Sequence, residues 1–195
     1  MKRNFKNLLM FTLVAGSLSM YSCKETKEDE AAEPMQNEMR EGEEMDHDMG
    51  MNEEQILKDE VTAQFGNQEI GTIYQHYINI KNALVQTDAT MAQDRAKEMV
   101  AALESTEANS AVAEAARKIA TESNVNIQRE AFSDLTSAME AQLEGALESG
   151  EIYKQYCPMA FEGKGDSWFS NTKEIRNPYY GDKMLKCGRV EATIK

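Results

Sequence analysis

The sequence predicts an all-α fold, an up-down four-helix bundle with a compact irregular C-terminal tail. Between Thr72 and Glu144 there is neither glycine nor proline, the two residues that most weaken a helix. Apolar residues recur there at spacings of three and four, which places them on one helical stripe. Short polar breaks separate four such stripes, and short connections imply antiparallel neighbours. We therefore expect the helical bundle over residues 68–150 and the tail over residues 151–195.

Each of the four expected helices has its own apolar stripe. Thr87-Asp88 and Asn109-Ser110 offer side-chain oxygens that cap the second and third helices. A polar break at Ser123-Asn124 separates the third helix from the fourth. The stripes are, in chain order, Ile70, Ile73, Tyr77, Ile80 and Leu84; Ala92, Ala96, Met99 and Leu103; Val112, Ala116 and Ile119; and Phe132, Leu135, Met139 and Leu143.

The tail differs from the helical stretch in composition. It holds seven of the fourteen aromatic residues, four of the eleven glycines and two of the three prolines, and it lacks helical periodicity. Glycine and proline favour turns, and aromatic side chains contribute large apolar contacts. We therefore expect a turn-rich tail with one or two short strands, packed on the bundle through its aromatic residues.

The N-terminus has the pattern of an exported lipoprotein. Residues 1–22 combine a basic start, a short apolar run and small residues, which is typical of a signal peptide and too short to span a bilayer. Cys23 follows directly, after Ser22, as in a lipobox. Acylation of Cys23 by fatty acids such as palmitate would anchor the chain in the cell envelope, and we expect the outer membrane. Of the three cysteines, Cys157 and Cys187 would then remain as a pair.

Residues 23–67 are expected to form a lipidated, acidic, Met/His-rich and disordered tether. Thirteen acidic residues stand between positions 24 and 54 against three basic ones, so the segment buries too little apolar surface to offset its ordering entropy. Residues 1–22 carry three basic and no acidic residues, and their removal lowers the net charge from −13 to −16. Such a chain repels nucleic acid, and we expect cationic proteins or metal ions as partners.

The tether contains a motif suited to a soft metal ion. Met45, His47, Met49 and Met51 recur at two-residue spacing, and thioether and imidazole groups on a flexible chain can wrap a copper ion. Methionine keeps this ability where a free thiol would oxidise. The alternative is an acidic tether in which the methionines have no role.

The tail carries a second candidate site, built of sulfur. Cys157 and Met159 lie two residues apart, and Met184 and Cys187 lie three residues apart. If the two halves fold together, four soft sulfur atoms converge, and this donor set selects copper(I) over zinc, calcium or magnesium.

The two tail cysteines also have a structural interpretation. Two cysteines in an oxidising compartment most often form a disulfide, which for this loop length would contribute about 3 kcal/mol. From spacing alone, a Cys157–Cys187 disulfide ranks ahead of the metal site. The two interpretations are compatible, because a reduced pair could bind copper(I) and an oxidised pair could not.

The sequence contains few of the residue patterns that usually carry out catalysis, and we expect that the chain is not an enzyme. Its two histidines, His47 and His76, leave little scope for a zinc site or a histidine-based triad. We expect His76 near the edge of the bundle with a partly exposed, hydrogen-bonded side chain. Neither a glycine-rich phosphate loop nor a nucleophile elbow is present.

Parts of the helices and of the tail resemble a family of unknown function, DUF3347. The similar stretches are Tyr77–Val85, Arg129–Phe132, Cys157–Ala160, Ser167–Ser170, Glu174–Leu185 and Cys187-Gly188. The family is widespread in Bacteroidota as small helical lipoproteins, and its domain also occurs at the ends of membrane fusion proteins of copper and silver efflux pumps. The tether motif separately resembles the Met-Asp-His repeats of periplasmic copper resistance proteins. The resemblance, which covers about residues 71–190, implies an association with copper or a related heavy metal.

Two functional hypotheses follow for a lipid-anchored protein of the periplasm or cell surface. In the first, the four sulfur residues of the tail bind copper(I), the tether motif collects it, and the protein serves copper homeostasis or efflux. In the second, the chain is a noncatalytic interaction module of an efflux or envelope complex, and the tail cysteines form a disulfide. The resemblance points to a heavy-metal efflux membrane fusion protein as partner.

Overall fold

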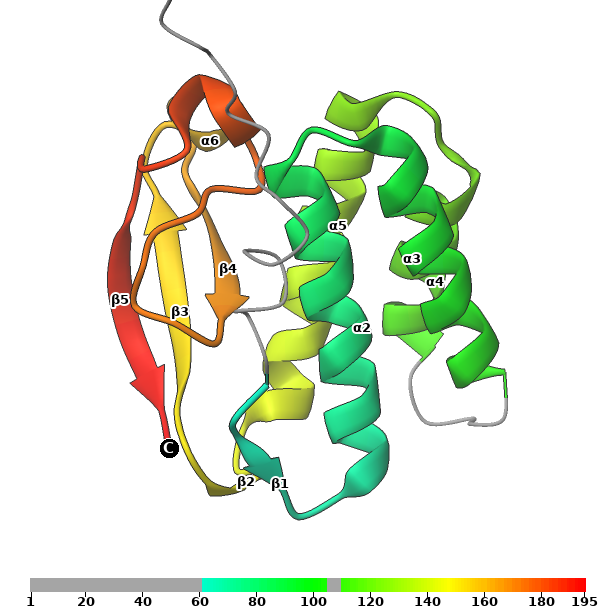
Figure 1. Ribbon diagram of the computed structural model, residues 1–195, viewed down its shortest axis with the longest axis vertical. Helices are drawn as coiled ribbons and strands as arrows, with labels where there is room; N and C mark the ends of the chain where they lie inside the picture. The colour runs from blue at the N-terminus through cyan, green and yellow to red at the C-terminus, as the bar shows by residue number, and fades with distance from the viewer. Residues whose placement is uncertain (1–60, 105–109) are drawn as a thin grey trace, which may run out of the picture. The chain divides into compact units, whose positions relative to one another are not determined.

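The computed structural model of the chain describes residues 61–104 and 110–195, shown in colour in Figure 1. Four consecutive helices occupy the segments where the apolar stripes predict them. These helices are α2 (Gln68–Val85), α3 (Ala89–Leu103), α4 (Ser110–Thr121) and α5 (Val125–Leu143). Every stripe residue is buried except Ile70, which is partly buried. The four-helix part of the prediction therefore holds for the positions of the helices.

Short polar side chains begin three of these helices. The Oδ1 atom of Asp88 accepts a hydrogen bond from the backbone N–H of Met91 at the start of α3. Asn67 and Asn124 do the same for α2 and α5, through the second residue of each helix. These bonds satisfy amide groups that have no partner within the helix. The expected cap at Asn109 lies outside the described residues.

The prediction of an all-α fold is wrong, because the tail forms a β-sheet. Three antiparallel strands, in the order β4-β3-β5, make up this sheet. A second sheet of two short strands joins the start of α2 to the end of α5. The strands are β1 (Gln64–Phe65), β2 (Leu147–Ser149), β3 (Ile152–Cys157), β4 (Asp166–Ser170) and β5 (Arg189–Ile194); α6 (Ala160–Gly163) and the 3-10 helix η1 (Gly181–Met184) lie between them.

The sequence predicts one or two short strands in the tail but no sheet, because burial does not alternate along β4 and β5. Trp168, Phe169 and Ser170 are consecutive in β4 and all three are buried, so the polar-apolar alternation of a half-buried strand is absent. In β5 the opposite holds, and its first five residues are exposed. Residues 64 and 65, which composition assigns to the tether, form β1.

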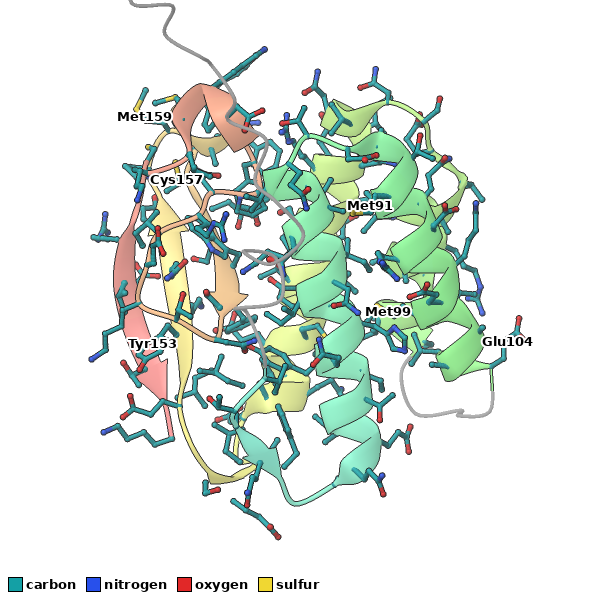
Figure 2. All side chains as sticks on the ribbon, viewed as in Figure 1. Met91, Met99, Glu104, Tyr153, Cys157 and Met159 are labelled. Atoms are coloured by element: carbon teal, nitrogen blue, oxygen red, sulfur yellow. The ribbon has the colours of Figure 1, made fainter. Side chains whose placement is uncertain are left out.

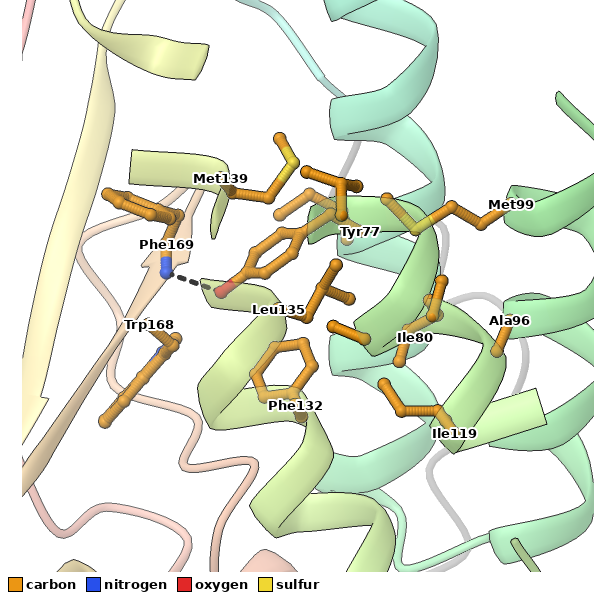
Figure 3. Packing of buried hydrophobic residues seen from close by; sticks show 14 of the residues in the cluster. Tyr77, Ile80, Ala96, Met99, Ile119, Phe132, Leu135, Met139, Trp168 and Phe169 are labelled. Carbon is orange, nitrogen blue, oxygen red and sulfur yellow. Dashed lines mark hydrogen bonds between the residues drawn. The ribbon is translucent and has the colours of Figure 1, made fainter. Parts of the chain in front are cut away.

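One face of the three-stranded sheet lies against α2 and α5, whereas α3 and α4 lie on the far side of these two helices (Figure 1). Tyr77 of α2 sits between the layers, with its ring centroid 5.0 Å from that of Phe132 and 6.0 Å from that of Phe169. Its hydroxyl accepts a hydrogen bond from the N–H of Phe169 at 3.0 Å, drawn in Figure 3, and shares another with Thr136. This phenol therefore links α2, α5 and β4 through buried bonds.

The other face of the sheet is covered by the long connection between β4 and β5. Adjacent strand residues point to opposite faces, so Trp168 lies away from Tyr77. Its ring meets Tyr179 of the connection edge-on, with centroids 6.0 Å apart. The side-chain amide of Gln155 in β3 donates to two carbonyl groups of the connection, those of Thr172 and Glu174. Both faces of the sheet are therefore covered around β4, whereas β5 is exposed.

Replacing Tyr77 by phenylalanine should destabilise the domain by about 1–3 kcal/mol, because the buried N–H of Phe169 loses its acceptor. Burial raises the pKa of Tyr77 above its usual value, although the bonds with Thr136 and Phe169 oppose this shift. The folded state therefore holds the phenolic proton more tightly than the unfolded state. The contribution of this proton to stability is complete below about pH 10 and is lost as the pH rises beyond that value.

Urea unfolding at about pH 8 and about pH 10.5 measures both effects. Wild-type protein should lose stability between these two conditions, and the Tyr77→Phe variant should lose less. Equal losses in the two proteins would contradict a buried, neutral Tyr77.

Candidate functional site

The two tail cysteines meet at one end of the sheet. Cys157 is the last residue of β3, and Cys187 lies two residues before β5. Their Sγ atoms are 3.2 Å apart, and no disulfide joins them. Cys157 is fully buried within the hydrophobic core, whereas Cys187 is half-buried. The structure therefore contains a dithiol with one thiol closer to solvent.

Strand pairing explains why residues so far apart in the chain come together. β3 and β5 are antiparallel, and Tyr156 pairs with Arg189, so the residues just before β5 lie beside the end of β3. Gly188 permits the close approach of this chain. A Cβ atom at position 188 would come within 2.9 Å of the Trp168 ring and 3.0 Å of the Tyr156 carbonyl oxygen, and φ there is +147°. A side chain at this position would push Cys187 away from Cys157.

The proximity of the thiols affects the protonation of Cys187. The hydrogen bond with Cys157 raises the pKa of the Cys187 thiol, and burial raises it further. The thiolate is the form that binds metal ions and attacks disulfides, so this thiol is not activated at neutral pH. A soft metal ion that binds the pair must displace protons.

The two tail methionines lie at the surface. Met159 is 50% exposed and Met184 is 37% exposed. Figure 2 shows Met159 beyond Cys157, at the outer end of the sheet. Their backbones are held in place: the Met159 carbonyl accepts from the Tyr180 hydroxyl, and the Met184 carbonyl accepts from the Cys187 N–H. The structure thus brings the two thiols into contact and leaves both thioethers open to solvent.

Other metal donors are sparse in the part of the chain that the structure describes. Across residues 61–104 and 110–195, histidine, cysteine and carboxylate side chains nowhere form a group of three or more that could hold a metal ion. His76 lies on α2 with a half-buried side chain. Burial lowers the pKa of His76, and its Nδ1 atom has no hydrogen-bond partner among the residues that the structure describes.

Several expected functional residues cannot be placed. The lipidation site Cys23 and the tether motif, with Met45, His47, Met49 and Met51, lie outside the described residues. Among the helices that are described, none is both long enough and apolar enough to cross a membrane.

Sequence reasoning missed two buried polar residues that support the dithiol. Arg129 is 6% exposed and Asn177 is fully buried. The Nε atom of Arg129 donates to the carbonyl of Pro178 at 2.9 Å, so α5 holds the chain directly after Asn177. A signal was present for Arg129, because it stands three residues before Phe132 on the apolar stripe of α5. An Asn-Pro dipeptide such as Asn177-Pro178 indicates a turn but not a buried one.

The described residues thus form an α+β domain in which four helices pack on a small sheet that carries a dithiol at its end. Residues 73–149 match the model of a family described as a protein of unknown function, DUF3347, and this segment belongs to that family. The match runs from within α2 to the end of β2, so both Cys157 and Cys187 lie beyond it. No curated protein and no solved structure matches the chain.

The dithiol should close to an intramolecular disulfide under mild oxidation, since the Sγ atoms need to approach by only about 1 Å to reach bonding distance. The test uses the chain with Cys23→Ser, so that these are the only two cysteines. Diamide should remove both free thiols and leave a monomer, as shown by thiol counting and mass spectrometry. A matched chain that also carries Cys187→Ser has one thiol, so it should either keep that thiol free or form an interchain dimer. Predominant interchain dimers of the first chain would contradict the observed placement.

Proposed function

We propose that this chain is a lipoprotein of the bacterial cell envelope that binds copper(I) and serves copper homeostasis or efflux. The observation that carries the proposal is the contact between the Cys157 and Cys187 thiols, 3.2 Å apart and unbonded. Thiolate sulfur is a soft donor that favours copper(I) over hard cations.

The distribution of the four sulfur atoms suggests separate roles for them. Cys157 is inaccessible to solvent, so an ion would reach the pair from the side of the half-buried Cys187. Met159 and Met184 are exposed and sit within three residues of the two cysteines, where their thioethers can contact an incoming ion. Thioethers carry no proton to displace, whereas each thiol must release one. In this proposal the thiols supply most of the affinity and the thioethers complete the donor set.

The N-terminal residues would extend this function. Acylated Cys23 would keep the domain at a membrane, and the Met45–Met51 motif would collect copper ions near it. A membrane fusion protein of a heavy-metal efflux system is the proposed partner, on the strength of the family resemblance. The acidic character of the chain, with net charge −13, suits a cationic partner surface.

The same sulfur contact supports a second candidate function. A disulfide between Cys157 and Cys187 would tie β3 to the connection before β5 and stiffen the sheet. The chain would then act as a noncatalytic interaction module of an efflux or envelope complex. The two candidate functions predict different copper binding. In the first, the reduced cysteine pair binds copper(I) and the disulfide form does not; in the second, the disulfide is structural and the cysteines bind no copper.

Copper(I) titration of the chain under reducing conditions should show binding that depends on the tail cysteines. A competing thiolate-selective chelator reports the affinity, and Cys157→Ser with Cys187→Ser should remove the tightest site. Changing Met159 and Met184 to leucine preserves most of the side-chain volume and should weaken binding by a smaller factor. Because the tether can bind copper as well, the same titration is repeated with Met45, His47, Met49 and Met51 replaced by alanine.

Two results of this titration would reject the proposal. Unchanged affinity in the double serine variant would place the copper site elsewhere. Uptake of copper by the diamide-treated disulfide form as strong as by the reduced form would favour the interaction module.

Replacing Cys23 by serine should abolish fatty-acid labelling and release the protein from membranes, because this cysteine alone stands at the expected signal-peptide boundary. Labelling with a palmitate analogue in a bacterial host, followed by membrane fractionation, measures both effects. Cys187→Ser is the matched control and should keep label and membrane association. Labelling of the Cys23→Ser variant at the wild-type level would contradict the lipoprotein assignment.

A further inference from the structure

The connection between β4 and β5 folds around one buried asparagine. Asn177 is fully buried, and all its polar groups are hydrogen-bonded. Its backbone carbonyl accepts from the N–H of Gly181, and its Oδ1 atom accepts from the N–H of Tyr179. These two bonds close the turn that follows Asn177. They leave its backbone N–H and its side-chain amide free to bond with a more distant part of the chain.

That more distant part is the segment that carries Cys187. The N–H of Asn177 donates to the carbonyl of Leu185 at 2.9 Å, and its Nδ2 atom donates to the carbonyl of Cys187 at 2.9 Å. Asn177 therefore holds the carbonyl groups of Leu185 and Cys187, the two residues that flank Lys186. The second of these bonds is made by the side chain, and it acts on the residue that bears the thiol.

Asn177 is itself attached to the rest of the fold. The next residue, Pro178, accepts a hydrogen bond from Arg129 of α5, which also donates to the Thr87 hydroxyl at 3.1 Å. The hydroxyl of Tyr179 donates to the carbonyl of Ser167 in β4 at 2.6 Å. Bonds to α5, to the loop after α2 and to β4 thus fix the turn at Asn177 relative to the sheet that carries Cys157.

Cys187 has other constraints besides this amide. Its N–H donates to the carbonyl of Met184, Gly188 after it packs closely against Trp168, and the pairing of β5 with β3 begins two residues later, at Arg189. The bond from the Asn177 side chain is the one that acts on the Cys187 carbonyl. Loss of the Asn177 amide would leave the Cys187 carbonyl without this partner and the turn before β5 less constrained.

We infer that Asn177 is a positioning residue, whose side-chain amide holds Cys187 at contact distance from Cys157. The functional meaning of this inference rests on the proposed role of the dithiol as the copper(I) site. Asn177 itself does not contact a bound ion. By holding Cys187 in place, Asn177 raises the effective concentration of one thiol at the other.

The equilibrium between the dithiol and its disulfide in a glutathione buffer measures this effective concentration without copper. The protein is the full chain with Cys23→Ser. Asn177→Asp keeps the shape of the side chain and the acceptor for Tyr179, but replaces the amide donor with a carboxylate oxygen facing the Cys187 carbonyl. We expect the equilibrium constant for disulfide formation to fall by about tenfold or more. Gln128→Glu is the matched control, because Gln128 is also a fully buried amide that donates to two backbone carbonyls, far from the cysteines.

Gln128→Glu should leave the glutathione equilibrium unchanged even if it lowers the free energy of unfolding. Asn177→Ser, which removes the amide donor without adding a charge, guards against a folding defect specific to the aspartate. A folded Asn177 variant with the wild-type equilibrium constant would overturn the inference. Loss of helical circular dichroism in both Asn177 variants would overturn it as well, since Asn177 would then support the whole fold rather than the placement of Cys187.

Copper(I) affinity measured on the same variants separates this inference from the proposed function. If the glutathione equilibrium shifts and the wild-type chain binds copper through its cysteines, the affinity should fall in the Asn177 variants but not in Gln128→Glu. If the equilibrium shifts and the cysteines bind no copper, Asn177 still positions the thiols and the copper proposal fails.

Discussion

The three-stranded sheet is covered on both faces around β4, although its strand β5 is exposed, and the position of the dithiol depends on this covering. One face packs on α2 and α5 around Tyr77, and the chain between Asn171 and Gly188 covers the other. A connection that crosses the face of a sheet must return to an edge to form the next strand. Here it returns to β3, opposite to the edge occupied by β4, so that Cys187 arrives beside Cys157.

Buried polar groups make this arrangement specific. The Tyr77 phenol, the Arg129 guanidinium and the Asn177 amide each join segments that are distant in sequence. An unsatisfied group of this kind costs about 1–3 kcal/mol, so each favours the one packing in which its bonds form. Apolar contacts alone would allow the connection to settle on the sheet in several ways. The polar contacts select the one that brings the thiols together.

The sequence predicted the helices well because their apolar residues keep helical spacing and short polar side chains mark their starts. Asp88 and Asn124 are N-caps where the breaks indicated them. One or two strands were expected in the tail, but the sheet was not, because both faces of β4 are covered, which removes alternation there, and because β5 is almost fully exposed. Polar-apolar alternation along the sequence identifies a strand that is buried on one face only. It does not identify strands that are covered on both faces.

The candidate site was predicted in part. Spacing suggested that the halves containing Cys157 and Cys187 converge, and the thiols do meet, whereas Met159 and Met184 remain exposed. The role of Asn177 could not be read from the sequence, because a buried asparagine and a solvated one look alike in a turn-rich segment. Its four hydrogen bonds depend on the path of the whole connection.

Copper(I) binding by the Cys157–Cys187 dithiol is the proposal on which the suggested function depends. X-ray absorption at the copper edge of the reduced, copper(I)-loaded chain, with the tether motif replaced by alanine, identifies the atoms that bind the ion. A dithiol site gives a first coordination shell of sulfur alone, which is lost when both cysteines are replaced by serine. A shell of nitrogen or oxygen, or a sulfur shell that survives the double replacement, would contradict this proposal.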